Sequence, residues 1–443
     1  MSSSSERILC SDGNCVGTIN EKGYCSICGK PLDRIQNALQ EYLKGLQETK
    51  MSKQESRKAI TNAADVNLGR VIEAENDFGF RLLLQLAKQR PNKNVFISPF
   101  SVAIALAMTY NGAENTTKQA MAATLGLTGL NLQEINATNR ILISMQKQFG
   151  PEIQLSIANS IWVREGIALA PEFIQRISDD YGGKIVNLNF SALDAAGTIN
   201  KWVADKTNEK IKALVTQDML NSPAILILIN AICFKGIWAQ QFEQAKTTNR
   251  SFTFLDGTGR QCPMMAQLGV YKYYENSNIQ AINMPYDDGQ LSMYIFLPKQ
   301  SSSIREFKTN LNTRNWRNWI PECRMRSGQI VLPRFKLEYG AGLKDALVAL
   351  GMGIAFEAGA NFQGMGAGQL WISDLVHKSF VEVNEKGTEA AAATRTGLLT
   401  GRPRPLEEKG FTMIVDHPFV AAICNNNSGA VLFAGFIMDP TLN

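Results

Sequence analysis

The chain has 443 residues, of which 45% are hydrophobic and 19% charged, enough for a sizeable core in one large domain or two to three smaller ones. The formal net charge of +5 is small for this length and the basic residues are spread out, so no nucleic-acid-binding surface is indicated. The longest apolar run, residues 224–234, is far shorter than the roughly 18 residues of a membrane span. The N-terminus also lacks the apolar core of a secretory signal, which predicts a cytoplasmic protein without a membrane partner.

Residues 1–32 hold four clustered cysteines. Four residues separate Cys10 from Cys15, and two separate Cys25 from Cys28. Four thiolates complete a tetrahedral shell around zinc, and a module this small has no core without a metal. A redox-active pair would need a βαβ context that is absent here. The pattern therefore resembles a structural zinc ribbon, although its first pair is wider than usual, and its protein partner is open.

The remaining cysteines are scattered and mostly have apolar neighbours: Cys233, Cys262, Cys323 and Cys424. Disulfides are rare in a reducing compartment, so a disulfide framework is the weaker interpretation. We expect these four side chains to be small buried hydrophobic groups.

Residues 33–70 form a polar, helix-prone connector. Ile35, Leu39, Leu43 and Leu46 recur at helical spacing, whereas the sequence that follows has few apolar anchors. A linker is the default interpretation, and a docking helix is the alternative. The main domain is predicted to occupy residues 71–443.

The first part of this domain has two helix signals. Phe78, Leu82 and Leu86 recur at helical spacing after Val71. Further along, Ser98-Pro99 is a helix start, because serine caps the free backbone amides and proline at the first helical position has no amide to satisfy.

Strand-like stretches follow in the middle of the chain. Residues 155–163 are one of them, and residues 225–234 are almost entirely apolar and rich in β-branched side chains. Such a run is typical of a strand buried on both faces. Trp238 ends it.

Residues 381–411 join an alternating segment to a run of small residues and then to a segment rich in Pro, Arg and Gly. Gly387 can serve as a hinge because it lacks a Cβ atom. The residues of one parity after it are small and uncharged: Thr388, Ala390, Ala392 and Thr394. The charges of Glu389 and Arg395 have the other parity, which is the pattern of a strand with one wet face. The alternative is a short alanine-rich helix in a surface loop.

Four segments of the chain resemble the serpin family. Residues 385–394 (EKGTEAAAAT) resemble the proximal hinge of a serpin reactive-centre loop, and residues 413–423 (MIVDHPFVAAI) resemble the C-terminal signature. Residues 94–101 (NVFISPFS) and 230–238 (NAICFKGIW) resemble two further serpin motifs, which occur in the order expected along the chain. The resemblance implies an α+β serpin fold with a large central β-sheet, smaller sheets, surrounding helices and an exposed loop at about residues 385–410.

The resemblance also implies roles for polar residues beneath and above the sheet. The shutter positions, which control the separation of the central strands, would be Ser98, Ser101, Asn230 and His377. Trp238 and Arg334 would lie at the breach, the entry point of the loop, with Arg334 paired to Glu385. Without the resemblance, His377 is an ordinary core histidine, and Arg334 and Glu385 are two independent surface charges.

The sequence argues against an enzyme. It contains two histidines, His377 and His417, and lacks the G-x-S-x-G nucleophile motif of hydrolases. Asp416-His417 invites interpretation as a catalytic pair. However, it lies in the C-terminal signature, where serpins carry a polar or basic residue for structural reasons.

The resemblance implies a suicide-substrate inhibitor of serine peptidases, in which the cleaved segment from Gly387 to about Gly401 inserts into the sheet. Family spacing places the reactive bond at Gly401–Arg402, with Thr400–Gly401 as the alternative. Leu398 and Leu399 favour elastase-like or subtilisin-like targets. The alternative function is a non-inhibitory serpin that acts as a binding or chaperone-like module through the zinc ribbon.

Overall fold

The computed structural model describes residues 55–146, 149–221, 226–287, 289–366, 369–388 and 410–442, with side chains from residue 68 onward. The four N-terminal cysteines, hinge residues 390–394 and the predicted reactive bond at residues 400–402 lie outside the described residues. None of the helices in the described part combines the length and apolar character needed to cross a membrane.

Two sheets organise the described part of the chain. The nine-stranded sheet has the order β1 (Val95–Ile97), β15 (Val431–Ile437), β14 (Phe419–Asn425), β8 (Leu291–Pro298), β7 (Ile279–Pro285), β6 (Gly259–Glu275), β9 (Arg324–Pro333) and β13 (Phe411–Ile414), with β5 (Thr248–Thr253) paired to β6. The six-stranded sheet has the order β10 (Phe335–Gly342), β11 (Ile372–Asn384), β12 (Gly387–Thr388), β4 (Leu226–Ile237), β2 (Ile153–Arg164) and β3 (Lys184–Leu188).

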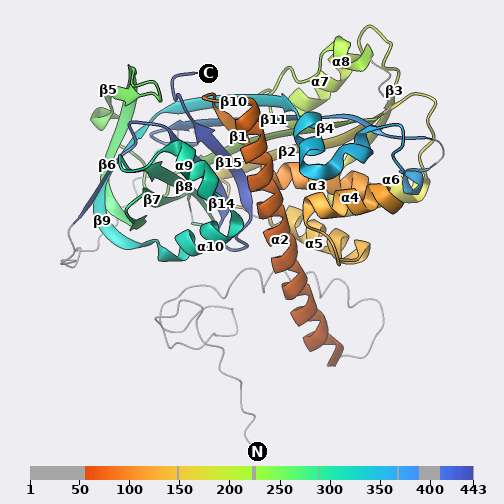
Figure 1. The fold of residues 1–443 in the computed structure, drawn as a ribbon, viewed down its shortest axis with the longest axis horizontal. Helices are drawn as coiled ribbons and strands as arrows, with labels where there is room; N and C mark the ends of the chain where they lie inside the picture. The colour runs from red at the N-terminus through yellow and green to blue at the C-terminus, as the bar shows by residue number, and fades with distance from the viewer. Residues whose placement is uncertain are drawn as a thin grey trace, which may run out of the picture.

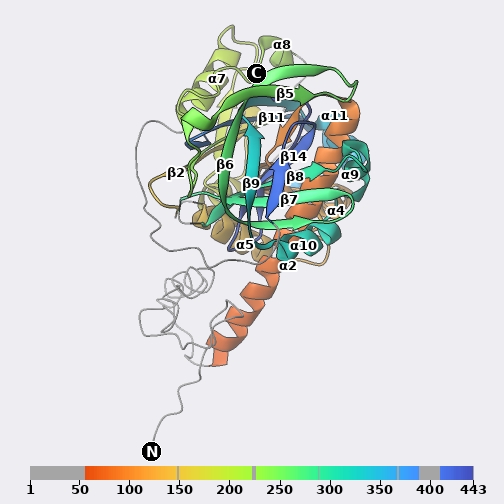
Figure 2. The ribbon, with the colours of Figure 1, turned by 90° about the vertical axis from the view of Figure 1, so that its left-hand side faces the viewer.

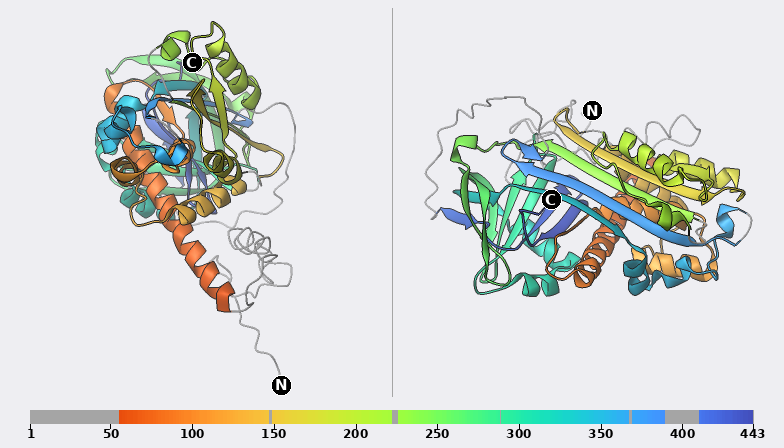
Figure 3. Two further views of the ribbon diagram at one scale, coloured as in Figure 1. Left: turned by 90° about the vertical axis from the view of Figure 1, so that its right-hand side faces the viewer. Right: turned by 90° about the horizontal axis from the view of Figure 1, so that it is seen from above.

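Helices cover both faces of the six-stranded sheet (Figure 3). The α-helices of the described part are α2 (Glu55–Gln89), α3 (Pro99–Tyr110), α4 (Asn115–Leu125), α5 (Leu132–Met145), α6 (Pro171–Tyr181), α7 (Ala195–Lys206), α8 (Gln217–Asn221), α9 (Ile304–Asn310), α10 (Thr313–Glu322) and α11 (Lys344–Leu347). Of these, α9 and α10 pack against strands of the nine-stranded sheet. In the view from above in Figure 3, α7 and α8 lie on one face of the sheet, and α2 and α3 lie on the other.

Strand β4 lies between two hydrophobic cores, which explains its continuous apolar sequence. Leu226 and Leu228 face the larger core, which also contains side chains of α2 and α3. Ile227 and Ile229 face the smaller core beneath α7. The predicted strand at residues 225–234 is therefore confirmed as a strand buried on both faces. Asn230, on the same face of β4 as Leu226 and Leu228, is a buried polar residue in this apolar strand.

Helix α2 begins at Glu55, inside the segment predicted to be a linker. It continues without a break to Gln89, so the predicted boundary at residue 70 does not coincide with the end of an element. No proline interrupts residues 55–89, and the two glycines, Gly69 and Gly79, are tolerated within a helix. The N-terminal part of α2 projects beyond the body of the molecule in Figure 1 and, turned by 90°, in Figure 2.

Candidate functional site

The site lies at the seam between β4 and β11. These two strands run parallel and pair directly from Leu226–Ile372 to Cys233–Phe380. Beyond this point β12 lies between them and pairs antiparallel with both strands. A short piece of a further strand thus occupies one end of the seam, and the rest of the seam is closed.

Gly387 fits between the two strands because it has no side chain. Its backbone has φ of 154°, and a Cβ atom here would overlap the carbonyl oxygen of Gly236 on β4. Any other residue would push β12 away from β4. The hinge role predicted for Gly387 thus has a steric basis at the point where the chain enters the sheet.

Thr388 is the first residue whose side chain enters the seam. It is fully buried, and its hydroxyl lies 2.6 Å from the hydroxyl of Tyr286. Tyr286 stacks on Trp238 with ring centroids 4.4 Å apart. The Trp238 indole donates a hydrogen bond to the carbonyl oxygen of Asn384 at 2.9 Å, and its backbone amide donates to Lys386 at 2.9 Å. Trp238 and Tyr286 therefore bond to the entering segment from Asn384 to Thr388.

Arg334 and Glu385 form the ion pair expected from the sequence. The guanidinium donates through two nitrogens to Oε1 of Glu385, with the Nε atom at 2.7 Å. The Thr247 hydroxyl donates to the same oxygen at 2.5 Å. Burial raises the pKa of Glu385, but the hydrogen bonds from Arg334 and Thr247 outweigh it, and the pKa is lowered overall. A charged carboxylate thus anchors the chain two residues before the hinge glycine.

The four residues predicted for the shutter meet in the middle of the seam. Asn230 and His377 are paired neighbours on β4 and β11, and His377 Nδ1 lies 2.5 Å from Asn230 Oδ1. The Asn230 amide donates to the Ser101 hydroxyl at 2.6 Å. Ser98 caps α3 by accepting the Ser101 amide at 3.1 Å, which confirms the predicted N-cap. The N-terminal end of α3 therefore contacts both strands of the seam: β4 through the Ser101 hydroxyl and β11 through the Ser98 backbone amide.

The hydrogen bonds around His377 require a neutral ring. Its Nε2 atom accepts the backbone amide of Ser98 at 3.3 Å, so the proton is on Nδ1, which donates to Asn230. Burial lowers the pKa of His377 to about 3. The ring therefore stays neutral near pH 7, and the bond between β4 and β11 is a bond between uncharged groups.

Three residues of the site were not predicted. Asn159 on β2 accepts the Asn230 amide at 2.5 Å and extends the polar row to a third strand. Its signal was a polar residue within a strand-like, apolar stretch. Tyr286 and Thr247 had no local signal, because they contact the hinge from segments about 100 residues or more away in the chain.

His417 has both ring nitrogens engaged. Nδ1 lies 2.8 Å from Asp416, and Nε2 lies 2.6 Å from the carbonyl oxygen of Pro298 at the end of β8. Burial lowers the pKa of this ring, but Asp416 and Pro298 outweigh it and raise the pKa overall. With Nε2 directed at a backbone carbonyl, the pair ties β14 to β8.

The four scattered cysteines are buried and are not joined by disulfides, as predicted. Among the described residues, no group of three or more His, Cys, Asp or Glu side chains could hold a metal ion. The N-terminal cysteines are not among these residues.

Comparison with known proteins identifies this architecture. The family model of serpin (serine protease inhibitor) matches residues 73–440. A serpin-like protein of Thermococcus kodakarensis is 35% identical over 84% of this chain and 86% of its own length. Human leukocyte elastase inhibitor is 34% identical over 83% of this chain and 98% of its own length. The native structure of the thermophilic serpin tengpin superimposes with a TM-score of 0.74 at 29% identity, covering 83% of this chain and 94% of tengpin. The chain belongs to the serpin family.

Proposed function

We propose that the protein inhibits serine peptidases as a suicide substrate. The peptidase serine would attack the carbonyl carbon of Gly401, or of Thr400 in the alternative register. The new ester would join enzyme and loop, and the amine of the following residue would leave with a proton. The freed segment would then enter the seam as a full central strand and carry the acyl-enzyme with it. Serpin loop insertion is a known instance of strand addition to a sheet.

The observation that carries this proposal is β12. Gly387 and Thr388 already pair with both seam strands. Continuing that register, each further residue of the loop would lie opposite one residue of β4 and one of β11. Thr394 would then lie between Asn230 and His377, whose side chains now bond directly across the seam. Its hydroxyl can both donate and accept, so it could take over that bond.

Side-chain size permits this entry. Alternation along a strand would turn Ala390, Ala392 and Thr394 to the same face as Thr388, which is fully buried. None of these side chains is large or charged, so none carries a high cost of burial. A loop that served only as exposed bait would not require this pattern.

The free-energy balance also favours insertion. Opening the seam loses one parallel ladder, and a new strand would form two antiparallel ladders in its place. The net gain is about ten backbone hydrogen bonds at roughly 1 kcal/mol each. This is comparable to the whole stability of an ordinary domain, about 5–15 kcal/mol.

The loop sequence favours targets of the elastase or subtilisin type. Leu398, Leu399 and Thr400 precede the proposed bond, whereas Arg402 and Arg404 are each followed by proline. A related protein carries the name leukocyte elastase inhibitor, which supports the same choice.

The test is to mix the protein with pancreatic elastase and, separately, with subtilisin. We expect a complex that survives SDS, and mass spectrometry should locate the cut after Gly401 or Thr400. Cleavage without a complex would show that the protein is a substrate of these peptidases and not their inhibitor.

A Thr388→Arg variant separates inhibition from the alternative function as a binding module. Arginine at this buried position should abolish the SDS-stable complex. Binding through the N-terminal cysteines should remain. Lys386→Ala is the matched control, because the Lys386 side chain is exposed and one residue from the hinge glycine.

For the N-terminus we propose a structural zinc site formed by Cys10, Cys15, Cys25 and Cys28, in a protein of the cytoplasm. Four thiolates suit zinc, and the metal would supply the folding energy of the module. Metal analysis of the purified full chain should give about one zinc per chain. Cys25→Ser should lower this value while leaving the melting temperature of the serpin domain unchanged.

A further inference from the structure

A cavity of about 200 Å³ lies between the β6–β7 turn and helices α9 and α10, away from the seam. Its wall includes four asparagines and one tryptophan: Asn276, Asn278, Asn310, Asn315 and Trp319. No charged residue lines it. This lining of neutral carboxamides and an aromatic ring differs from that of the cavity beside Arg334 and Glu385, which carries charges of both signs.

The wall of the cavity is fixed by hydrogen bonds. Asn276 Oδ1 accepts the backbone amides of Asn278 at 2.8 Å and Ile279 at 2.9 Å. The amide of Lys299 donates to the carbonyl oxygen of Asn278 at 2.7 Å, which ties the turn to the end of β8. On the opposite wall, Asn315 Nδ2 donates to the carbonyl oxygen of Asn310 at 2.7 Å. The cavity is therefore preformed, as ligand sites usually are.

Several polar atoms of this wall remain available. Within the described part of the chain, the Asn278 carboxamide makes no hydrogen bond, and Oδ1 of Asn310 and of Asn315 accepts none. A carboxamide presents both donors and acceptors, and it carries no charge. The side chain of Lys299, whose backbone amide bonds to Asn278, is paired with Glu275 at 2.9 Å.

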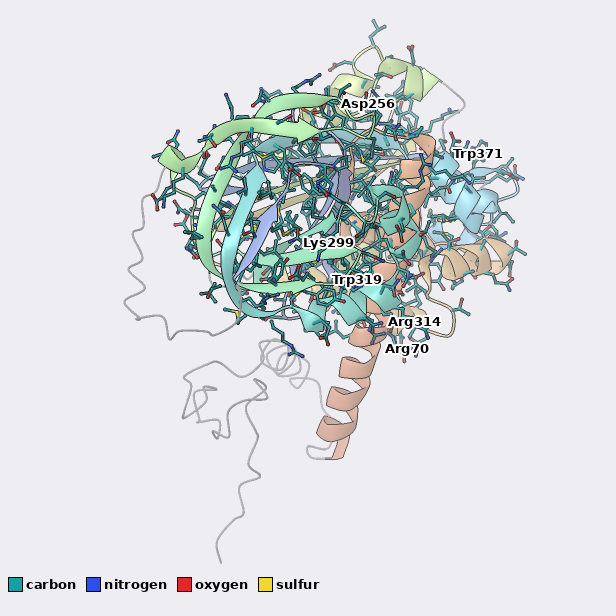
Figure 4. All side chains as sticks on the ribbon, turned by 60° about the vertical axis from the view of Figure 1, so that its left-hand side comes forward. Arg70, Asp256, Lys299, Arg314, Trp319 and Trp371 are labelled. Atoms are coloured by element: carbon teal, nitrogen blue, oxygen red, sulfur yellow. The ribbon has the colours of Figure 1, made fainter. Side chains whose placement is uncertain are left out.

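Trp319 supplies an apolar surface. Its ring packs against Phe296 and Phe307, with centroids 5.6 Å and 5.3 Å away, and it remains half-buried. Figure 4 shows Trp319 on the same side of the molecule as Lys299. The indole is thus held in place by the core while part of it borders the cavity.

We propose that this cavity binds a neutral, polyhydroxylated ring, that is, a sugar. Hydroxyl groups donate and accept, so they match the free carboxamides of Asn278, Asn310 and Asn315. The C–H face of a sugar ring is apolar and can pack on an aromatic surface such as Trp319. A charged ligand would lose hydration without gaining a counter-charge, which selects against it.

The experiment uses the full chain and ligand-observed NMR with glucose, galactose and N-acetylglucosamine. Glucuronate tests the effect of charge, and glycerol tests the need for a ring. We expect at least one neutral sugar to bind with a Kd of roughly millimolar size, as befits a small ligand. Glucuronate and glycerol should bind at least tenfold more weakly than that sugar. An oligosaccharide and a glycoprotein carrying it form a second arm, and tighter binding there would identify a glycan rather than a free sugar as the source.

Two variants locate the binding. Asn278→Ala removes an exposed amide without touching the core, and Trp319→Ala removes the aromatic surface. Each should weaken sugar binding at least tenfold. Asn318→Ala, on an exposed neighbour outside the cavity wall, should leave it unchanged. Absence of binding, binding that survives Asn278→Ala, or a preference for glucuronate would each overturn the proposal. Peptidase inhibition should be the same in all three variants, so the outcome is independent of the proposed function.

Discussion

The two ends of the β4–β11 seam are in different states. At the breach, Gly387 and Thr388 already separate the strands, and Thr388 is bonded to Tyr286. In the middle, the strands pair directly and His377 bonds to Asn230 across them. The first end resembles a sheet that has begun to accept a strand, and the second resembles a closed sheet.

This difference separates two steps that insertion would require. Entry at the breach needs a residue without a side chain followed by one that fits beside Tyr286. Progress beyond it needs the Asn230–His377 bond to open. A substitution at the breach should therefore affect whether insertion starts, and a substitution in the middle should affect how firmly the sheet stays closed.

The largest effect is expected from Gly387→Val at the breach. A Cβ atom at this position would overlap the Gly236 carbonyl oxygen, so β12 could not keep its place between the strands. The loop should still be cut, but insertion should be too slow to trap the enzyme. We expect the yield of SDS-stable complex with elastase to fall at least about a hundredfold, equivalent to roughly 2.7 kcal/mol.

The stoichiometry of inhibition measures this loss, with the thermal unfolding curve as the check on folding. Lys386→Ala serves as the control here as well. A normal yield of complex from Gly387→Val would show that the loop does not enter the seam past Gly236.

The second effect is expected from Asn230→Ala in the middle. This change removes the partner of His377 and leaves Ser101 and Asn159 without a shared donor. We expect a loss of about 2 kcal/mol in the free energy of unfolding, because buried polar groups are left unpaired.

Urea denaturation measures that loss, and incubation at moderate temperature should show faster conversion to an inactive form. Asn318→Ala, which changes an exposed asparagine on α10, should have little effect on either measurement. Equal stability of Asn230→Ala and the parent protein would mean that the polar row does not hold the strands together.

The sequence predicted the helix and strands of the seam better than it predicted which of them contact one another. The serine N-cap of α3 and the doubly buried strand at residues 225–234 follow from local patterns, and both are confirmed. Periodicity could not show that β4 lies beside β11, since their paired residues are about 147 positions apart. Tyr286 was missed for the same reason, because its contact with Thr388 depends on the bridge between Trp238 and Tyr286, which joins the end of β4 to the end of β7.

A pH-dependent effect is expected to be smaller and to act on the middle of the seam. His377 has a folded pKa of about 3 and an ordinary value of 6.5, so the unfolded chain binds a proton that the folded chain does not. Its contribution to stability is complete above pH 6.5 and is lost as the pH falls toward 3. Relative to a His377→Gln variant, the protein should lose about 1.4 kcal/mol per pH unit in this range.

Urea denaturation of both proteins at pH 7, 6 and 5 gives this difference. The comparison with the variant is needed because Glu75, whose pKa burial raises to about 8, changes stability in the opposite direction over the same range. A difference that stays constant with pH would show that His377 titrates normally and that the seam is open to solvent.

The smallest effect is expected from the ion pair that anchors the breach. Glu385 is nearly buried but Arg334 is 37% exposed, so solvent screens part of their attraction. Glu385→Gln should lower the free energy of unfolding by about 1 kcal/mol. Because the folded pKa of Glu385 is lowered, the contribution of Glu385 to stability is present above pH 4.5 and is lost as the pH falls through the folded value.

A double-mutant cycle with Arg334→Ala measures the coupling between the two charges. As a control, Lys246→Ala, which breaks an exposed pair with Glu243, should change the free energy of unfolding very little. If the cycle gave no coupling, Thr247 and the backbone alone would position the hinge, and the breach would depend on shape rather than charge.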